Sequence, residues 1–177
     1  MHAPQSRFLP LTALSSALVL AACVPQRPAP APTPVSSPTA QPTPKPVATV
    51  RPIANWRDMP ATPGDWSWSR PVTGSQAVFA GGLFKMHCSR ENRTITLTRA
   101  ASGTTTQAQM LISTTQGNRS LVANPVAGGV AASLDARDPL LDDMAFSRGR
   151  FAVEVAGSDP LYIPSWTEVS RVIEDCR

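Results

Sequence analysis

Histidine is scarce in this sequence, with two copies in 177 residues. His2 lies in the N-terminal segment, which leaves His87 for the rest of the chain. A Ser-His-Asp or Cys-His mechanism would have to use His87 together with an acid that orients its ring. Alternation along the surrounding strand turns His87 outward with Lys85, so we interpret it as an exposed strand histidine.

Several motifs that carry chemistry are also missing. The chain has no C-x-x-C pair, no glycine-rich phosphate loop after a predicted strand, and too few His and Cys residues for a zinc site. Four acids fall within nine residues, without the ligand spacing of an EF-hand: Asp135, Asp138, Asp142 and Asp143. We interpret them as a helix cap and a polar helix face, with metal binding and acid-base catalysis as alternatives. The sequence therefore predicts no cofactor, no metal and no enzyme activity.

The net charge of +4 is unevenly distributed along the chain. Arg7, Arg27, Lys45 and Arg51 precede residue 54, and residues 54–177 hold 12 basic and 12 acidic residues. The basic character therefore belongs to the N-terminal segments. A neutral domain of this kind is not expected to bind nucleic acid.

The N-terminus has the pattern of an export signal. An apolar run from Phe8 to Ala22 has the length of a signal-peptide core and is short for a membrane span. It ends in Leu20-Ala21-Ala22-Cys23, which resembles the lipobox of bacterial lipoproteins. The resemblance implies that residues 1–22 are removed and that Cys23 carries a lipid anchor. An ordinary cleaved signal with a chance cysteine is the alternative.

The next segment is rich in proline. Ten of the 19 prolines lie between Cys23 and Ile53, among small and polar residues. Such a segment cannot bury enough surface to fold, and polyproline II is its favoured geometry. We expect residues 23–53 to form a disordered spacer, or an arm that contacts the cell wall or a partner, and residues 54–177 to form the folded domain.

The folded part shows short runs of period two. They are separated by Gly, Asn, Ser and Pro clusters, and they cover residues 64–70, 83–88, 93–99, 107–113, 119–123, 130–134, 150–156 and 161–163. Seven or eight short strands at this spacing predict a mainly β (α+β) fold, an antiparallel sandwich or barrel.

Two short helices are predicted after the sixth and eighth of these runs. Asp138 followed by Pro139 is typical of a helix start, and Gly149 can end that turn. Ser165 and Glu168 fit a capping box for a C-terminal helix. Its apolar residues share one face with Cys176, so that thiol is expected to point toward the core.

Cys88 and Cys176 remain once Cys23 is assigned to the lipid. Both are predicted to face inward, and the exported compartment is oxidising, so we expect a structural disulfide between them. A redox-active pair or two free thiols are the alternatives.

Arg148 and Arg150 flank Gly149 where a helix is predicted to give way to a strand. Such a fork could bind an acidic partner or a cell-wall carboxylate. The alternative, which we favour from the sequence, is that these arginines pair with Asp142 and Glu154. The tryptophans could form a saccharide platform, but core packing is the interpretation we favour for them: Trp56, Trp66, Trp68 and Trp166.

The folded part also resembles the mature domains of uncharacterised small envelope lipoproteins of alphaproteobacterial type. The likeness lies in the run from Asp138-Pro139-Leu140-Leu141 to Phe151 and in the close from Pro164-Ser165-Trp166 to Arg177. A fainter likeness, in strand spacing and the C-terminal cysteine, links it to invasion-associated β-sandwich envelope proteins. Neither resemblance implies catalytic residues.

The function expected from these features is a non-catalytic module, lipid-anchored in the cell envelope, that binds another envelope component. Val24 and Pro25 follow the lipidated cysteine without an Asp. Under the enteric sorting rule, this implies the outer membrane, with the domain facing the periplasm. The alternative function is a periplasmic enzyme, or enzyme inhibitor, that acts on the cell wall.

Overall fold

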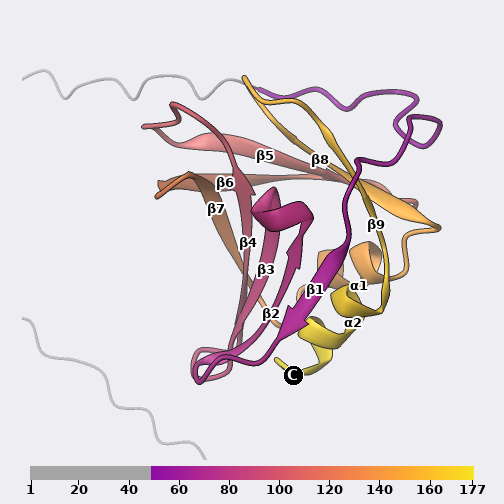
Figure 1. Ribbon diagram of the computed structural model, residues 1–177. Coiled ribbons are helices and arrows are strands. Elements are labelled where there is room, and N and C mark those ends of the chain that lie inside the picture. The colour runs from indigo at the N-terminus through magenta and orange to yellow at the C-terminus, as the bar shows by residue number, and fades with distance from the viewer. Residues whose placement is uncertain (1–48) are drawn as a thin grey trace, which may run out of the picture. The chain divides into compact units, whose positions relative to one another are not determined.

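The computed structural model describes residues 49–177, in which nine strands and three short helices form (Figure 1). The strands are β1 (Trp66–Ser69), β2 (Gly74–Phe79), β3 (Phe84–Ser89), β4 (Thr94–Ala100), β5 (Ala108–Ser113), β6 (Asn118–Val126), β7 (Gly129–Asp135), β8 (Arg150–Val155) and β9 (Leu161–Pro164). The helices are the 3-10 turn η1 (Ala80–Gly82), α1 (Pro139–Ala145) and α2 (Thr167–Glu174). The predicted signal, Cys23 and the spacer up to residue 48 lie outside the described residues. In residues 49–177, no helix is long and apolar enough to cross a membrane.

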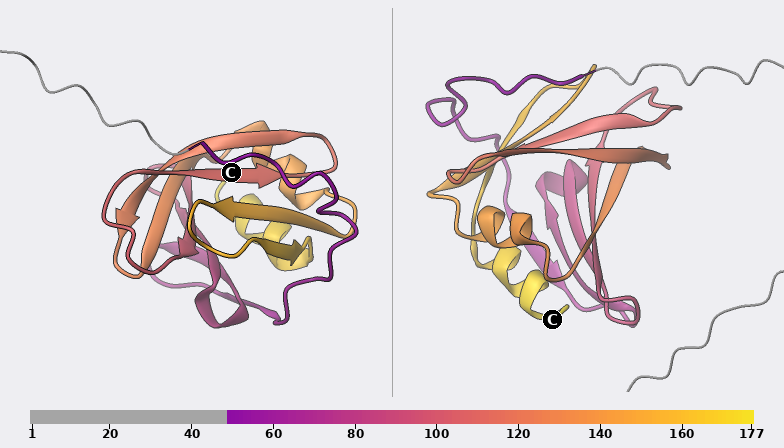
Figure 2. Two further views of the ribbon diagram at one scale, coloured as in Figure 1. Left: turned by 90° about the horizontal axis from the view of Figure 1, so that it is seen from above. Right: turned by 180° about the vertical axis from the view of Figure 1, so that it is seen from behind.

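All nine strands pair antiparallel in one sheet, ordered β1-β2-β3-β4-β7-β6-β5-β8-β9. The mainly β class and the two predicted helices, the last at the C-terminus, are therefore confirmed. The sheet is open rather than closed into a barrel, and it curls strongly (Figure 2). Strand β6 spans the bend, because residues 118–123 pair with β5 whereas residues 124–126 pair with β7.

The core lies inside this curl, and the inward side chains of the strands fill it. Phe84, Met86 and Cys88 of β3 are fully buried, as are Ile95 and Leu97 of β4, which pair with Cys88 and Met86. Apolar residues of both helices join the same cluster. The period-two pattern therefore identified the inward face of these strands correctly.

Strand β2 was missed from the sequence. Its inward residues are Ser75, Ala77 and Phe79, and all three are fully buried. A serine and an alanine give little hydrophobic contrast with their neighbours, so the alternation is weak. The strand forms because it lies between β1 and β3 and hydrogen-bonds to both.

The structure confirms the predicted cap of the first helix but not that of the second. The Asp138 side chain accepts a hydrogen bond from the Leu140 N–H at 2.9 Å, as a cap should, so this prediction is confirmed. The capping box predicted for the last helix is wrong. Trp166 occupies the N-cap of α2 without a side-chain bond, and the Ser165 hydroxyl donates instead to the Met144 carbonyl of α1. Because the Ser165 hydroxyl bonds to α1, it is not available to cap α2.

Residues 50–62, here called the strap, lie along the outer face of β8 and β9 (Figure 1). The Ile53 N–H donates to the Glu154 carboxylate at 3.4 Å, and Trp56 packs against Ala152 and Tyr162. Thr62 exchanges two hydrogen bonds with the Tyr162 backbone. The strap therefore covers the free edge of β9, which would otherwise expose unpaired backbone groups.

Candidate functional site

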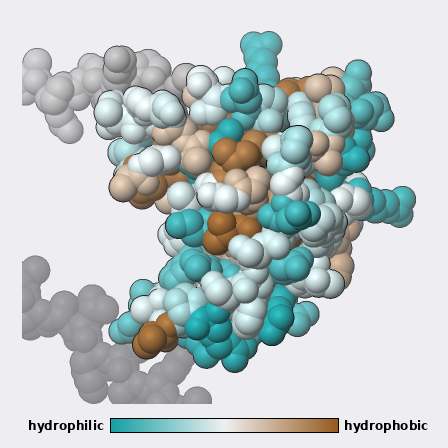
Figure 3. All heavy atoms as spheres, viewed as in Figure 1, coloured by the Kyte–Doolittle hydropathy of each residue, from teal (hydrophilic) through white to brown (hydrophobic). Residues whose placement is uncertain are grey.

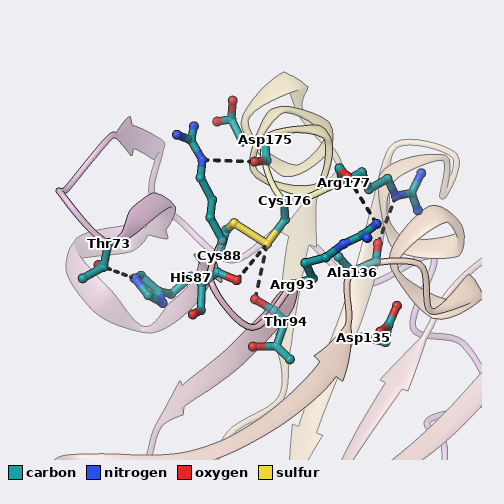
Figure 4. Close-up of a disulfide and its surroundings, with 12 residues drawn as sticks. Thr73, His87, Cys88, Arg93, Thr94, Asp135, Ala136, Asp175, Cys176 and Arg177 are labelled. Atoms are coloured by element: carbon teal, nitrogen blue, oxygen red, sulfur yellow. Dashed lines mark hydrogen bonds between the residues drawn. A yellow bond between two sulfur atoms is a disulfide. The ribbon is translucent and has the colours of Figure 1, made fainter.

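The predicted disulfide is present between Cys88 and Cys176, with the two Cα atoms 5.5 Å apart (Figure 4). It ties the residues after α2 to Cys88, the second-last residue of β3, and the last helix lies against that strand. The neighbouring His87 points away from the sulfur atoms and lies 3.4 Å from the Thr73 hydroxyl. Its one side-chain partner is thus a hydroxyl and not an orienting acid, as far as the described residues go.

Three of the four clustered acids serve separate structural roles. Asp138 caps α1 and forms an ion pair with Arg119, Asp142 forms an ion pair with Arg177 at 2.7 Å, and the Asp135 carboxylate accepts from the Arg137 N–H. Asp143 lines a shallow hollow beside the β5–β6 turn. Within residues 49–177 no three His, Cys, Asp or Glu side chains gather where they could hold a metal ion.

The expected pairing of Arg148 and Arg150 with Asp142 and Glu154 is wrong. Asp142 is taken by Arg177, which the disulfide-anchored C-terminus brings back to α1. Glu154 lies on the same face of β8 as Arg150, but the two positions are four residues apart along the strand, roughly 13 Å and beyond direct contact. Arg150 instead donates to the Met59 carbonyl of the strap.

Both arginines line one cavity of about 580 Å³, here called the arginine cavity, together with Arg57 of the strap. Its other lining residues are Thr115 and Gln116 of the β5–β6 turn, Phe146 and Gly149. Three guanidinium-bearing side chains thus surround a space whose lining contains no carboxylate. The cavity is chemically suited to an anionic group, because guanidinium forks match the oxygens of carboxylates and phosphates.

Three segments far apart in the sequence hold this cavity in shape. Arg57 donates to the Thr114 carbonyl at 3.3 Å, which ties the strap to the end of β5. The Ser147 hydroxyl donates to the Arg150 carbonyl at 2.6 Å and accepts from the Thr115 N–H at 3.1 Å. Gly149 adopts a φ of +77°, a conformation that L side chains rarely adopt, and so turns the chain between the two arginines.

The arginine cavity has one exposed aromatic side chain at its rim. Phe146 follows α1 and is 73% exposed, which is unusual for a phenylalanine. On the face of the domain in Figure 3, by comparison, apolar atoms surface only in small patches among polar ones. An exposed ring beside cationic groups could contact the apolar part of a bound anion.

The tryptophans divide between packing and surface roles. Trp66 lies in the main core and Trp56 in the small cluster under the strap. Trp68 is half-buried with the Arg171 guanidinium 3.5 Å above its ring, and Trp166 is 45% exposed. Trp56 and Trp66, which are both buried, offer no ring surface to a saccharide.

Arg148 and Arg150 were candidates from the sequence, whereas Arg57 was not. No sequence pattern indicates Arg57, because it lies 91 residues before Arg148 in a segment without periodicity. Only the docking of the strap on β8 and β9 brings it to the cavity.

Comparison with known proteins gives no match. Neither a protein-family model nor a curated protein nor a solved structure is similar to this chain.

Proposed function

We propose that this chain is a non-catalytic, lipid-anchored module of the cell envelope that binds an anionic group of another envelope component through the arginine cavity. The observation that carries the proposal is the set of Arg57, Arg148 and Arg150 around one cavity without a lining carboxylate. Like charges gathered on a concave surface raise the local concentration of anions and orient them. Cell-wall carboxylates are the anions we consider first.

The Cys88–Cys176 disulfide is consistent with an extracytoplasmic, oxidising compartment. The lipobox-like Leu20-Ala21-Ala22-Cys23 supports a lipid anchor, and Val24 and Pro25 support sorting to the outer membrane. A proline-rich spacer from residue 24 to the start of the strap at residue 50, at ~3.1 Å per residue, would extend roughly 80 Å, far enough to carry the domain from the bilayer toward the cell wall.

Binding is tested by sedimentation of the full-length protein with purified cell-wall sacculi. The Arg57→Ala/Arg148→Ala variant should bind at least about tenfold more weakly, and wild-type binding should fall steeply with salt because the contact is between charges. Arg150 stays unchanged because its bond to Met59 anchors the strap. Arg57 also holds the strap, through the Thr114 carbonyl. The Arg148→Ala single variant, which leaves both of these bonds in place, is therefore measured beside the double variant and should also bind more weakly.

Arg137→Ala is the matched control, because Arg137 is exposed, lies outside the arginine cavity and has no side-chain hydrogen bond among the described residues. Equal loss of binding in this control would indicate nonspecific attraction to the domain's charge. Undiminished binding of the double variant would show that the arginine cavity is not the site.

The anchor is tested separately with Cys23→Ser. The variant should accumulate as unprocessed precursor or as a product without acyl label. Incorporation of palmitate into this variant, with continued partition into detergent, would show that Cys23 is not the lipidated residue.

A further inference from the structure

A second cavity, of about 750 Å³, opens at the other end of β8 from the arginine cavity. Three chain segments line it: residues 100–105 at the end of β4 and beyond it, residues 128–129 at the start of β7, and residues 157–159 after β8. Leu83 and Val126 add apolar surface and are 37% and 43% exposed. We call it the Arg99 cavity after its one basic lining residue.

Arg99 is unusual among the charged residues described because it points into the curl of the sheet. It continues the inward alternation of Ile95 and Leu97 in β4, and it is 5% exposed. Its guanidinium donates to the carbonyls of Ala100 and Asp159, the latter at 2.8 Å. The Nε–H is buried without a hydrogen-bond partner.

The charge of Arg99 is also left without an ion-pair partner among residues 49–177. The three ion pairs found there involve other arginines. Burial lowers the pKa of Arg99, while the negative charge of Asp159 acts in the opposite direction. A buried cation with an unmade hydrogen bond is costly, and an anion that reached the guanidinium would relieve that cost.

The lining restricts the kind of anion that fits. Asp159 also lines the cavity, and its negative charge acts on Arg99, so a doubly charged ligand would meet stronger repulsion there than a singly charged one. Leu83 and Val126 offer contact to a short hydrocarbon part. Three residues that carry hydroxyl groups also line the cavity: Ser102, Thr104 and Ser158.

We propose that the Arg99 cavity binds a small monocarboxylate with a short apolar tail, its carboxylate directed toward the Arg99 guanidinium and its tail toward Leu83 and Val126. Because this cavity and the arginine cavity lie at opposite ends of β8, binding here does not depend on the function proposed above.

The probe is butyrate, titrated into the full-length protein labelled with ¹⁵N-arginine. The Arg99 Nε–H resonance, assigned by through-bond correlation, should shift saturably as the carboxylate binds beside the guanidinium. The Thr104→Trp variant should bind at least about tenfold more weakly, because the indole fills the cavity. Thr106→Trp is the matched control: it lies on the same loop, is exposed and does not line the cavity, so its affinity should be unchanged.

Inorganic phosphate and propylamine are titrated in parallel, and each should bind more weakly than butyrate. Tighter binding of phosphate, equal binding by Thr104→Trp, or a butyrate shift that never saturates would each overturn the proposal. Arg99→Lys should also weaken binding. Because Arg99 holds the β8–β9 turn and this variant could fail to fold, the Thr104→Trp and Thr106→Trp pair decides the test.

Discussion

The indole Nε1 of Trp66 in β1 donates a 2.8 Å hydrogen bond to the carbonyl oxygen of Pro164 in β9. These two strands are the outermost of the sheet, and they are not paired by a backbone ladder. The bond is buried and joins residues 98 positions apart. Trp66 also packs against Phe79 and Phe84, so one side chain holds the two edges of the curled sheet together from the inside.

Trp66→Phe keeps an aromatic ring in the core but removes the donor to Pro164. Because the carbonyl would be left buried and unpaired, we expect the free energy of unfolding to fall by about 1–3 kcal/mol, with a further loss from the smaller ring. Urea unfolding measures the change. Trp166→Phe, at a residue that is 45% exposed, should change stability by less than about 0.5 kcal/mol. Equal effects at both positions would contradict the role of the bond.

Cys176→Ser should destabilise the domain strongly, because the disulfide closes a loop between residues 88 positions apart. In the chain-entropy model, such a loop contributes roughly 4 kcal/mol, or a fall in melting temperature of well over about ten degrees. The unlipidated wild-type protein should weigh two hydrogen atoms less than its reduced form and should resist mild reductant until it unfolds. Rapid reduction of the native protein would instead support a redox-active pair.

Asp138→Ala should cost about 1 kcal/mol, because the N-cap bond to Leu140 is lost. Burial raises the pKa of Asp138, but the bonds from Arg119 and Leu140 and the charge of Arg119 outweigh it, so the pKa lies below its usual value. The carboxylate therefore stabilises the fold above the usual aspartate pKa, and this contribution disappears as the pH falls through the lowered value. Asp138→Asn should keep the cap at neutral pH but show less acid sensitivity than wild type in thermal melts from pH 7 to pH 2. Unchanged acid sensitivity would show that this carboxylate does not contribute.

Glu154→Gln should stabilise the domain at neutral pH. Burial under the strap raises the pKa of Glu154, and the bond from the Ile53 N–H opposes this only in part. The folded state therefore holds the proton more tightly than the unfolded state, and stability falls as the pH rises from the usual glutamate pKa through the raised value. In thermal melts from pH 4 to pH 8, the melting temperature of the variant should not show this fall. Glu174→Gln, at an exposed residue, should retain it. Parallel pH profiles of wild type and Glu154→Gln would contradict the prediction.

Strands with strong contrast between neighbouring side chains could be predicted from the sequence. In β3, Phe84 and Met86 alternate with Lys85 and His87, and the structure buries the first pair. In β2 the contrast in hydrophobicity between neighbouring side chains is too weak to predict a strand. The strand forms because β2 pairs with β1 and β3. The cap at Asp138 is a local interaction between adjacent residues and was predicted, whereas the role of Ser165 depended on α1, a distant partner.

The candidate site was half predictable for the same reason. Arg148 and Arg150 stand out because they flank a glycine between two elements. Whether they are paired or free depends on where the C-terminus and the strap lie. Arg177 reaches Asp142, and Arg57 reaches the arginine cavity, only in the folded chain.

By itself, the sequence determined the mainly β class, the inward face of most strands, the first helix start and the Cys88–Cys176 bond, because these follow from periodicity and from composition. Tertiary structure alone decided the curl of the sheet, the bond of Trp66 between its two edge strands, the burial of Glu154 and the placement of three arginines around one cavity. These features join segments about fifty to a hundred residues apart. Such contacts depend on the summed packing of the whole core, which no local pattern of residues records.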